Sequence, residues 1–141
     1  MALVIPDASE VLMLRFALGD VTPAATCKLR LYVNDYTPVP NSVAANFTEM
    51  TTQNYAPITL TNTNWTVTAE DPEALGVQAQ QTFTFDGSGG NTIVYGYYIT
   101  DDTAGALLWA ERFPASPTVP DIIGGTIKIT PKFTFATLND L

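Results

Sequence analysis

The sequence predicts an all-β fold, an antiparallel β-sandwich resembling a jelly roll, with a short N-terminal helix. Three observations favour this class. About seven short segments alternate apolar and polar residues with the period of two that is typical of half-buried strands. Turn-forming Gly, Pro, Asn and Asp residues separate these segments. No repeat or shift in composition divides the 141 residues, so we expect a single domain over 1–141 with a helical arm at 1–19.

Residues at the two ends of the N-terminal arm predict that it is a helix. Asp7 and Glu10 fit a capping box with Asp7 as the N-cap, and Gly19 follows the last apolar residue of the pattern. Alternate residues over 12–18 are also apolar, which leaves a strand as the competing interpretation. In either form the segment is apolar on nearly every side, so we expect it to be buried and to cover the second face of the central hairpin.

The next two segments are a strand and a long loop. Residues 28–34 alternate cleanly, which predicts a strand with Leu29 and its apolar neighbours facing inward and Tyr32 among the outward residues. Residues 35–47 contain two prolines and predict a long loop, and loops of this length are often functional or lie against a partner. The following elements are expected in the order strand 58–60, turn 62–64, strand 65–68, surface loop 69–77, strand 80–86 and Gly-rich turn 86–91.

The most apolar stretch, residues 92–113, predicts a β-hairpin at the centre of the molecule. β-Branched and aromatic residues dominate both arms, and a small polar linker ending in Gly105 joins them. Pairing of Thr100 with Ala106 places Glu111 opposite Tyr95, on a bulky apolar face. The other face is mostly apolar as well, and strands covered on both faces belong inside a molecule or at a subunit contact. On the bulky face we expect Ile93, Tyr95, Tyr97, Ile99, Leu107, Trp109 and Phe113, and on the other Val94, Gly96, Tyr98, Leu108 and Ala110.

The C-terminal part predicts a crossing segment and one clear strand. Residues 114–125 hold three prolines and a Gly pair, which favour an extended segment with little conformational freedom. Residues 126–135 alternate threonines and lysines with apolar residues. Pro131 interrupts this strand and cannot donate to a ladder, so we expect an edge or a bulge there.

Composition excludes one class of partner and favours another. The net charge is −8, with only six basic residues, whereas nucleic-acid binding requires a positive footprint. Charged residues make up 14% and apolar residues 46%, so Thr, Asn, Gln and Ser must supply most of the polar surface. Wide neutral surface of this kind suits stable packing against neighbouring protein subunits.

No residue constellation predicts catalysis, and we expect no enzymatic activity, cofactor or metal site. The chain lacks histidine, which removes the usual general base and the commonest transition-metal ligand. Cys27 is alone, so it forms no intrachain disulfide and no Cys-based metal site. The carboxylate pair Asp101–Asp102 and the acidic loop at 70–73 are best explained as solvated turn residues. Glu111 is explained by a hydrogen-bonded carboxylate near the open end of the hairpin, by a register shift at a bulge, or by an ion pair with an Arg across a subunit contact.

The N-terminus does not predict a secretion signal or a membrane anchor. Asp7 and Glu10 precede any basic region, and Arg15 interrupts the apolar run. No stretch approaches the roughly 20 apolar residues of a membrane-spanning helix. We therefore expect no membrane partner and synthesis in the cytoplasm.

Framework residues across nearly the whole chain resemble small virion-associated proteins encoded among the structural genes of tailed bacteriophages. The resemblance is carried by Leu3–Met13, Leu29–Asn34, the strand that begins at Trp65, Val94–Tyr98 and Leu108–Phe113. It includes no site motif. It implies a protein of the phage particle and leaves open whether that protein decorates the capsid or belongs to the tail.

The leading functional hypothesis is a capsid decoration, or cement, protein on the outer surface of the virion. It would form a homo-oligomer and bind the major capsid protein or another virion protein through non-covalent contacts. Two alternatives stay open: a tail-associated receptor- or carbohydrate-binding module with exposed tyrosines, and a small enzyme using paired carboxylates. The candidate contact segments are 1–18, 35–47 and 114–125. The candidate interface residues are Leu3, Val4, Ile5, Tyr36, Val39, Phe47, Gly96, Tyr98, Val119 and Ile122.

Overall fold

A computed structural model describes residues 3–70, 73–115, 118–119 and 124–136. It confirms the predicted class: antiparallel β-structure with one N-terminal helix, α1 (Asp7–Ala17). The largest sheet has four strands in the order β2 (Ile58–Thr61), β1 (Thr26–Tyr32), β7 (Gly96–Asp101) and β8 (Leu107–Arg112). The two arms of the predicted hairpin, β7 and β8, are neighbours in this sheet, and β7 is an inner strand.

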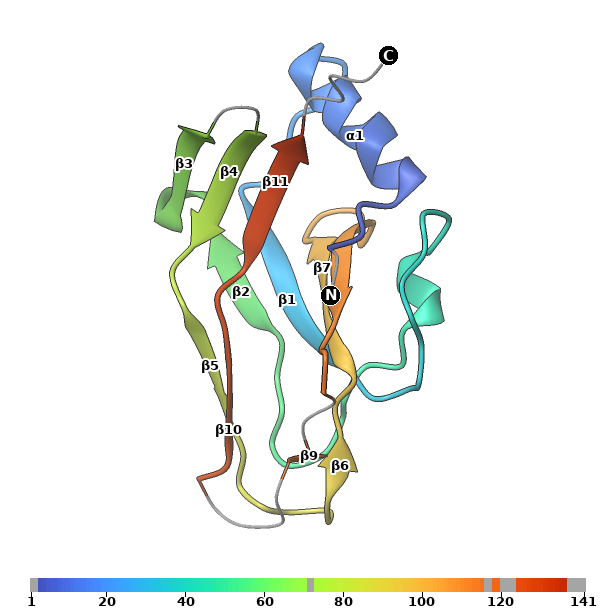
Figure 1. Cartoon of the computed structure of the whole chain (residues 1–141), viewed down its shortest axis with the longest axis vertical. Coiled ribbons are helices and arrows are strands. Elements are labelled where there is room, and N and C mark those ends of the chain that lie inside the picture. Colours follow the sequence, from blue (N-terminus) through green and yellow to red (C-terminus); the bar gives the residue numbers. More distant parts are fainter. Residues whose placement is uncertain (1–2, 71–72, 116–117, 120–123, 137–141) are drawn as a thin grey trace.

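A second layer lies against the four-stranded sheet and is divided into two ladders (Figure 1). A jelly roll has two continuous four-stranded sheets, so the coarser description, a sandwich-like packing of antiparallel sheets, is the one the structure supports. One ladder comprises β11 (Lys132–Ala136), β4 (Glu73–Gln78) and β3 (Trp65–Glu70). The other pairs β10 (Thr126–Ile129) with β5 (Gln81–Thr84), and a short separate ladder pairs β6 (Thr92–Ile93) with β9 (Thr118–Val119).

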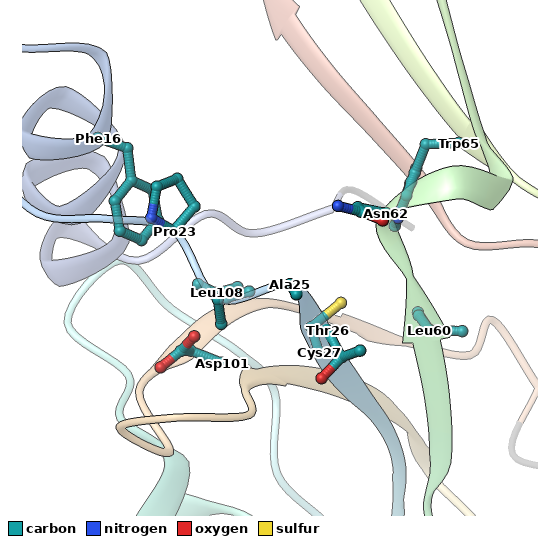
Figure 2. A pocket seen from close by; sticks show the side chains of 11 residues that line it. Phe16, Pro23, Ala25, Thr26, Cys27, Leu60, Asn62, Trp65, Asp101 and Leu108 are labelled. Atoms are coloured by element: carbon teal, nitrogen blue, oxygen red, sulfur yellow. The ribbon is translucent and has the colours of Figure 1, made fainter. Parts of the chain in front are cut away.

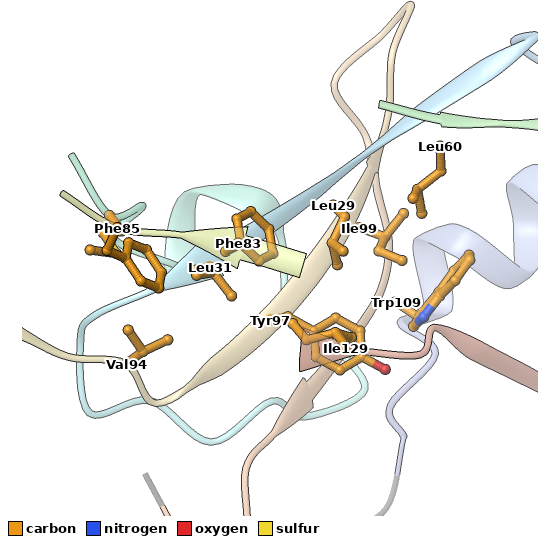
Figure 3. Close-up of a cluster of buried hydrophobic side chains, with 11 residues drawn as sticks. Leu29, Leu31, Leu60, Phe83, Phe85, Val94, Tyr97, Ile99, Trp109 and Ile129 are labelled. Atoms are coloured by element: carbon orange, nitrogen blue, oxygen red, sulfur yellow. The ribbon is translucent and has the colours of Figure 1, made fainter. Parts of the chain in front are cut away.

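The main hydrophobic core fills the space between the two layers. Phe83 and Ile129, from β5 and β10, point toward Leu29 on β1 in the facing sheet (Figure 3). Burial of such side chains is the chief stabilising contribution in a domain of this size. The buried members of this cluster are Leu29, Leu31, Met50, Leu60, Phe83, Phe85, Val94, Tyr97, Ile99, Trp109 and Ile129.

A second core covers the opposite face of the four-stranded sheet. The loop over residues 33–47, with the short 3-10 helix η1 (Ala44–Asn46), folds over this face and places Phe47 in a stack on Tyr98, with ring centroids 4.8 Å apart. Arg112 holds the loop in place through an ion pair of 2.6 Å with Asp35. The loop, and not the N-terminal helix as the sequence suggested, therefore covers the second face of the hairpin. It also buries Tyr32 completely, although the alternation had placed Tyr32 outward.

The N-terminal helix forms as predicted but differs in its cap and its burial. Pro6 is the N-cap, Asp7 is the first helical residue, and no side chain caps the helix, so the expected capping box is absent. Ser9 is the only buried residue of α1, whereas Leu14 and other large apolar residues are exposed. The expectation of a helix buried on nearly every side was therefore wrong.

The hairpin register differs from the predicted one by one residue next to the turn, where Thr100 pairs with Leu107 instead of Ala106, and by two residues beyond a bulge at Leu108. Ile99 pairs with Trp109 and Thr100 pairs with Leu107, so the pairing shifts by one residue between them. Glu111 consequently lies opposite Tyr97 instead of Tyr95, and it accepts a hydrogen bond of 2.8 Å from the Tyr97 hydroxyl. The bulge also moves Leu107 into the second core. The chain is irregular at residues 94–95, between β6 and β7, which reverses the expected faces of Val94 and Tyr95 and leaves Ile93 exposed.

Two further predictions about strands needed correction. Residues 73–78, expected as part of a surface loop, form β4, which pairs with both β3 and β11. The single strand expected over 126–135 is two strands in different ladders, divided at Pro131. The carbonyl of Pro131 accepts a hydrogen bond from the Gln78 N–H, and the proline itself has no N–H to continue the ladder. The turn expected at residues 62–64 is the 3-10 helix η2 (Asn62–Asn64).

Gly96 is expected to be indispensable for folding. A Cβ at this position would lie 2.6 Å from the Tyr32 hydroxyl oxygen and would also meet the Glu111 backbone carbonyl, which cannot move away. Gly96→Ala should therefore lower the free energy of unfolding by about 3 kcal/mol or more, measured by chemical denaturation. Gly76→Ala is the matched control, because its Cβ would have no neighbour closer than 3.8 Å, and it should leave stability unchanged or raise it by up to about 1 kcal/mol. Equal effects of the two substitutions would contradict this account.

Stability is expected to fall at alkaline pH because tyrosines are buried in the neutral form. Burial raises the pKa of Tyr32 and that of Tyr98 to about 12, from an ordinary value of 10. The unfolded chain therefore releases these protons first, so their contribution is complete below about pH 10 and is lost as the pH rises toward 12. Tyr98→Phe keeps the ring and removes one ionising group. The denaturation midpoint of this variant should therefore fall less than that of the unmodified chain as the pH rises from about 10 to 12. A midpoint independent of pH over this range would refute the assignment.

Candidate functional site: an apolar cleft beside the N-terminal helix

The N-terminal arm positions α1 at one end of the sandwich. Val4 pairs with Ala110 on the outer edge of β8 through two backbone hydrogen bonds, of 3.0 and 3.1 Å, which close the edge of that strand. The helix then begins at Asp7, whose N–H donates to the Pro40 carbonyl at 2.8 Å. The buried Ser9 hydroxyl donates to the Leu107 carbonyl. These contacts fix the N-terminal half of the helix and set its direction over β8 (Figure 1).

An open apolar cleft separates α1 from the inner face of the β3–β4–β11 ladder. Its volume is about 300 Å³. The floor includes Gly76, which pairs with Val67 in the β3–β4 register, and Val67 is 73% exposed. Among the residues that the structure describes, those that line this cleft are all apolar or aromatic. Its lining residues are Met13, Phe16, Trp65, Val67, Gly76, Leu108, Trp109 and Phe133.

Aromatic rings form the deep wall of the cleft. Trp65 meets Trp109 edge-on, with centroids 5.7 Å apart, and Trp109 contacts Phe133 at 5.0 Å. Trp109 is almost fully buried, and its indole N–H makes no hydrogen bond of ordinary geometry. That N–H nevertheless lowers the pKa of the Tyr97 hydroxyl, against the larger upward effect of burial, so the two groups lie near each other in the core. The wall is therefore made of aromatic rings that pack on one another and on the main core.

A smaller cavity of about 170 Å³ adjoins the cleft and shares Phe16, Trp65 and Leu108 with it. Figure 2 shows it between the helix and the ends of β1 and β2, with Cys27 and Asp101 at its base. The Asp101 carboxylate accepts a hydrogen bond of 2.6 Å from the Ala104 N–H, so it stabilises the hairpin turn. Burial raises the pKa of the Cys27 thiol to about 11, which keeps it protonated and poorly nucleophilic.

Polar side chains elsewhere on the sheet are engaged in structural contacts. Arg30 binds Glu49 at 2.7 Å and donates to Thr100, while the Tyr55 hydroxyl donates to Glu49 at 2.9 Å. The same hydroxyl accepts a hydrogen bond from the Leu31 N–H. The network thus supplies a partner to β1 beyond the residues that pair with β2. Among the described residues, no group of three or more His, Cys, Asp or Glu side chains is placed to hold a metal ion. No helix of the described part is long and apolar enough to cross a membrane.

The structure distributes the sequence-predicted interface residues over several environments. Leu3, Val4 and Ile5 are half-buried, and Val4 pairs with the β8 edge. Gly96, Phe47 and Tyr98 are buried within the chain, and Tyr36 is half-buried against them. Val39 is exposed on the loop. Val119 belongs to β9, and Ile122 lies outside the described residues. These residues do not form one continuous site.

Sequence reasoning missed the cleft because two of its walls were assigned wrongly. The interpretation of 69–77 as a loop concealed the strand that carries Gly76, and the helix was expected to be covered on all sides. A signal was present: Met13 and Phe16 follow one helical face, while other apolar residues of the same helix follow the opposite face. A helix that packs on its domain along one face leaves a second, opposite apolar face exposed.

The cleft is expected to bind a neutral apolar dye. Nile red suits this test, because the net charge of −8 would repel the anionic dyes commonly used. Gly76→Leu places a side chain in the cleft and should lower the dye fluorescence about fivefold or more, because the apolar volume is then filled. Val43→Ser, on the far loop, removes an exposed apolar side chain and is the control. Equal fluorescence in Gly76→Leu and the unmodified chain would exclude the cleft as the dye site.

Comparison of the chain with protein-family models, with curated proteins and with solved structures found no match.

Proposed function

We propose that this chain is a structural protein of a tailed-phage virion, a capsid decoration protein that binds the outside of the assembled head. The open apolar cleft carries the proposal, because it offers a water-exposed site whose described lining residues are all apolar or aromatic and so suit contact with another protein. The resemblance to virion-associated proteins and the low charge density support the same assignment.

The proposed mechanism is non-covalent clamping. A large apolar side chain presented by the major capsid protein, or by another virion protein, enters the cleft between α1 and the β3–β4–β11 ladder. Burial of that side chain contributes about 1.5–3 kcal/mol. The surrounding threonine-rich strand surface supplies neutral hydrogen bonds at the rim. Because the chain binds the assembled shell and not free subunits, binding stabilises the shell by mass action.

The carbohydrate-binding alternative receives less support from the side-chain positions. It requires exposed aromatic rings together with polar groups that bind sugar hydroxyls. Tyr32 and Tyr98, which lie on the sheet that could form such a platform, are buried in the second core. Tyr55 is half-buried and hydrogen-bonded to Glu49, and the described residues that line the cleft are apolar or aromatic.

Particle localisation is the first test of the proposed function. Immunogold electron microscopy of purified virions, with an antibody against this chain, should label heads evenly. Label confined to tails would overturn the decoration assignment in favour of a tail component. The absence of label, together with absence of the chain from the particle by mass spectrometry, would overturn the virion assignment altogether.

The cleft is expected to determine binding to heads. Val67→Asp places a carboxylate at the cleft mouth, where an apolar partner would have to desolvate it, so affinity for heads lacking this chain should fall about tenfold or more. Ile93→Asp, at an exposed position on β6, is the matched control and should bind normally. Both variants should keep the circular dichroism spectrum of the unmodified chain. Unchanged affinity of folded Val67→Asp would exclude the cleft as the contact.

A further inference from the structure

The N-terminal helix α1 has two opposite apolar stripes. At 3.6 residues per turn, Ser9, Met13 and Phe16 fall within one stripe, and Val11, Leu14 and Leu18 fall within another centred about 180° away. The first stripe faces the protein: Ser9 is buried, and Met13 and Phe16 line the cleft. The second stripe therefore faces away from the domain that carries it.

The outer stripe is exposed along its whole length. Val11 is 59% exposed, Leu14 60% and Leu18 74%. Isolated apolar residues on a surface require no explanation, but three in a row along one helix face indicate a contact surface. Their spacing of three and then four residues is that of positions a, d and a in a coiled-coil heptad. Leu18, the C-cap residue, completes the stripe.

We propose that two copies of this chain associate in parallel through the outer stripes of α1. The stripe is self-complementary, so a twofold axis along the helix pair brings Val11, Leu14 and Leu18 of one copy against the same residues of the other. The inner stripe already binds each helix to its own domain, so the two domains lie on opposite sides of the helix pair. The helix is preformed and anchored through Ser9, which lowers the entropy cost of pairing such a short segment.

The charges beside the stripe favour a second copy and select the parallel orientation. With Val11 at position a, Glu10 occupies position g and Arg15 occupies position e. In a parallel pair a g residue faces the e residue five positions later in the partner, so each Glu10 meets the other copy's Arg15. In an antiparallel pair g faces g and e faces e, which opposes like charges. Arg15 already binds Asp20 at 2.6 Å in an exposed pair, and its five donors can serve both carboxylates.

One charge opposes this arrangement. Asp7 precedes the stripe at a d position, so a parallel pair brings the two Asp7 carboxylates toward each other. Asp7 is exposed and lies in the first turn of α1, where water and the helix dipole reduce the repulsion. Asp7→Asn should accordingly tighten the dimer.

The pairing leaves both clefts open, because cleft and outer stripe are on opposite sides of α1. A dimer would present two clefts in fixed relation, and bivalent binding to a repeating surface raises avidity without any new contact. The pairing depends on residues of α1 alone and is independent of the proposed capsid role.

Sedimentation equilibrium of the full-length chain tests the association over about a hundredfold range of concentration. We expect a monomer–dimer equilibrium whose dissociation constant rises about tenfold or more in Leu14→Asp, because a charge then lies in the centre of the contact. Val43→Asp is the matched control, since Val43 is similarly exposed on the distant loop, and it should dimerise normally. A chain that stays monomeric throughout, or a dimer that persists in Leu14→Asp, would overturn the proposal.

Two further variants test the parallel orientation. Glu10→Lys should weaken the dimer, and addition of Arg15→Glu should restore it, because the swapped charges again meet with opposite sign. Leu18→Cys, in a Cys27→Ser background, should form an intermolecular disulfide under mild oxidation. In an antiparallel pair centred on the stripe, the two copies of residue 18 would be displaced by about 10 Å along the axis, beyond disulfide reach. A dimer without this disulfide, or without restoration by the double swap, would exclude the parallel arrangement.

Discussion

The burial of β7 on both faces is the constraint on which the rest of this structure depends. All six residues of the strand are buried, and Gly96 at its start permits the Tyr32 ring to lie directly against it. A strand with no solvent face requires two covers. The β5–β10 ladder supplies one, and the loop over residues 33–47 supplies the other through Phe47. The long loop therefore completes the core.

This division of roles determines where the N-terminal arm lies. The loop covers the outer face of β7, and the arm pairs with the edge of β8, through Val4 and Ala110. The helix that follows is left at the end of the sandwich, where it contacts its domain along one stripe. The apolar cleft and the outer stripe both follow from that incomplete coverage. Both proposed contacts of the protein thus originate in the topology of its core.

The fold class, the helix and most strands could be predicted because each depends on local pattern. Period-two alternation located β1, and a Gly-containing turn located the β7–β8 hairpin. Which face of the sheet a side chain occupies depends on local irregularities of the strand, and the residue types in the sequence give little indication of these. The bulge at Leu108 and the irregular residues 94–95 each shift the alternation by one position, which moves Leu107 and Val94 to opposite cores.

The cleft could not be predicted for a different reason. β4 is poor in residues that favour strands, with Glu73 at its start and Gly76 in its middle, and it forms a strand because β3 and β11 pair with it on both sides. Tertiary pairing of this kind overrides local propensity. The cavity beside it depends on the angle at which α1 leaves β8, which hydrogen bonds from Asp7 and Ser9 determine. Such long-range contacts are not encoded in the periodicity of any single segment.

The composition of α1 becomes intelligible when its two stripes are considered together. A helix that only closed its own domain would need Ser9, Met13 and Phe16 and would place polar residues at 11, 14 and 18. Keeping large apolar residues there costs solubility, which the net charge of −8 offsets. The second stripe therefore has no role in the fold of the single chain. Its exposed residues are best explained by contact with another protein surface, and the opposite charges of Glu10 and Arg15 on its flanks match that surface to its own copy.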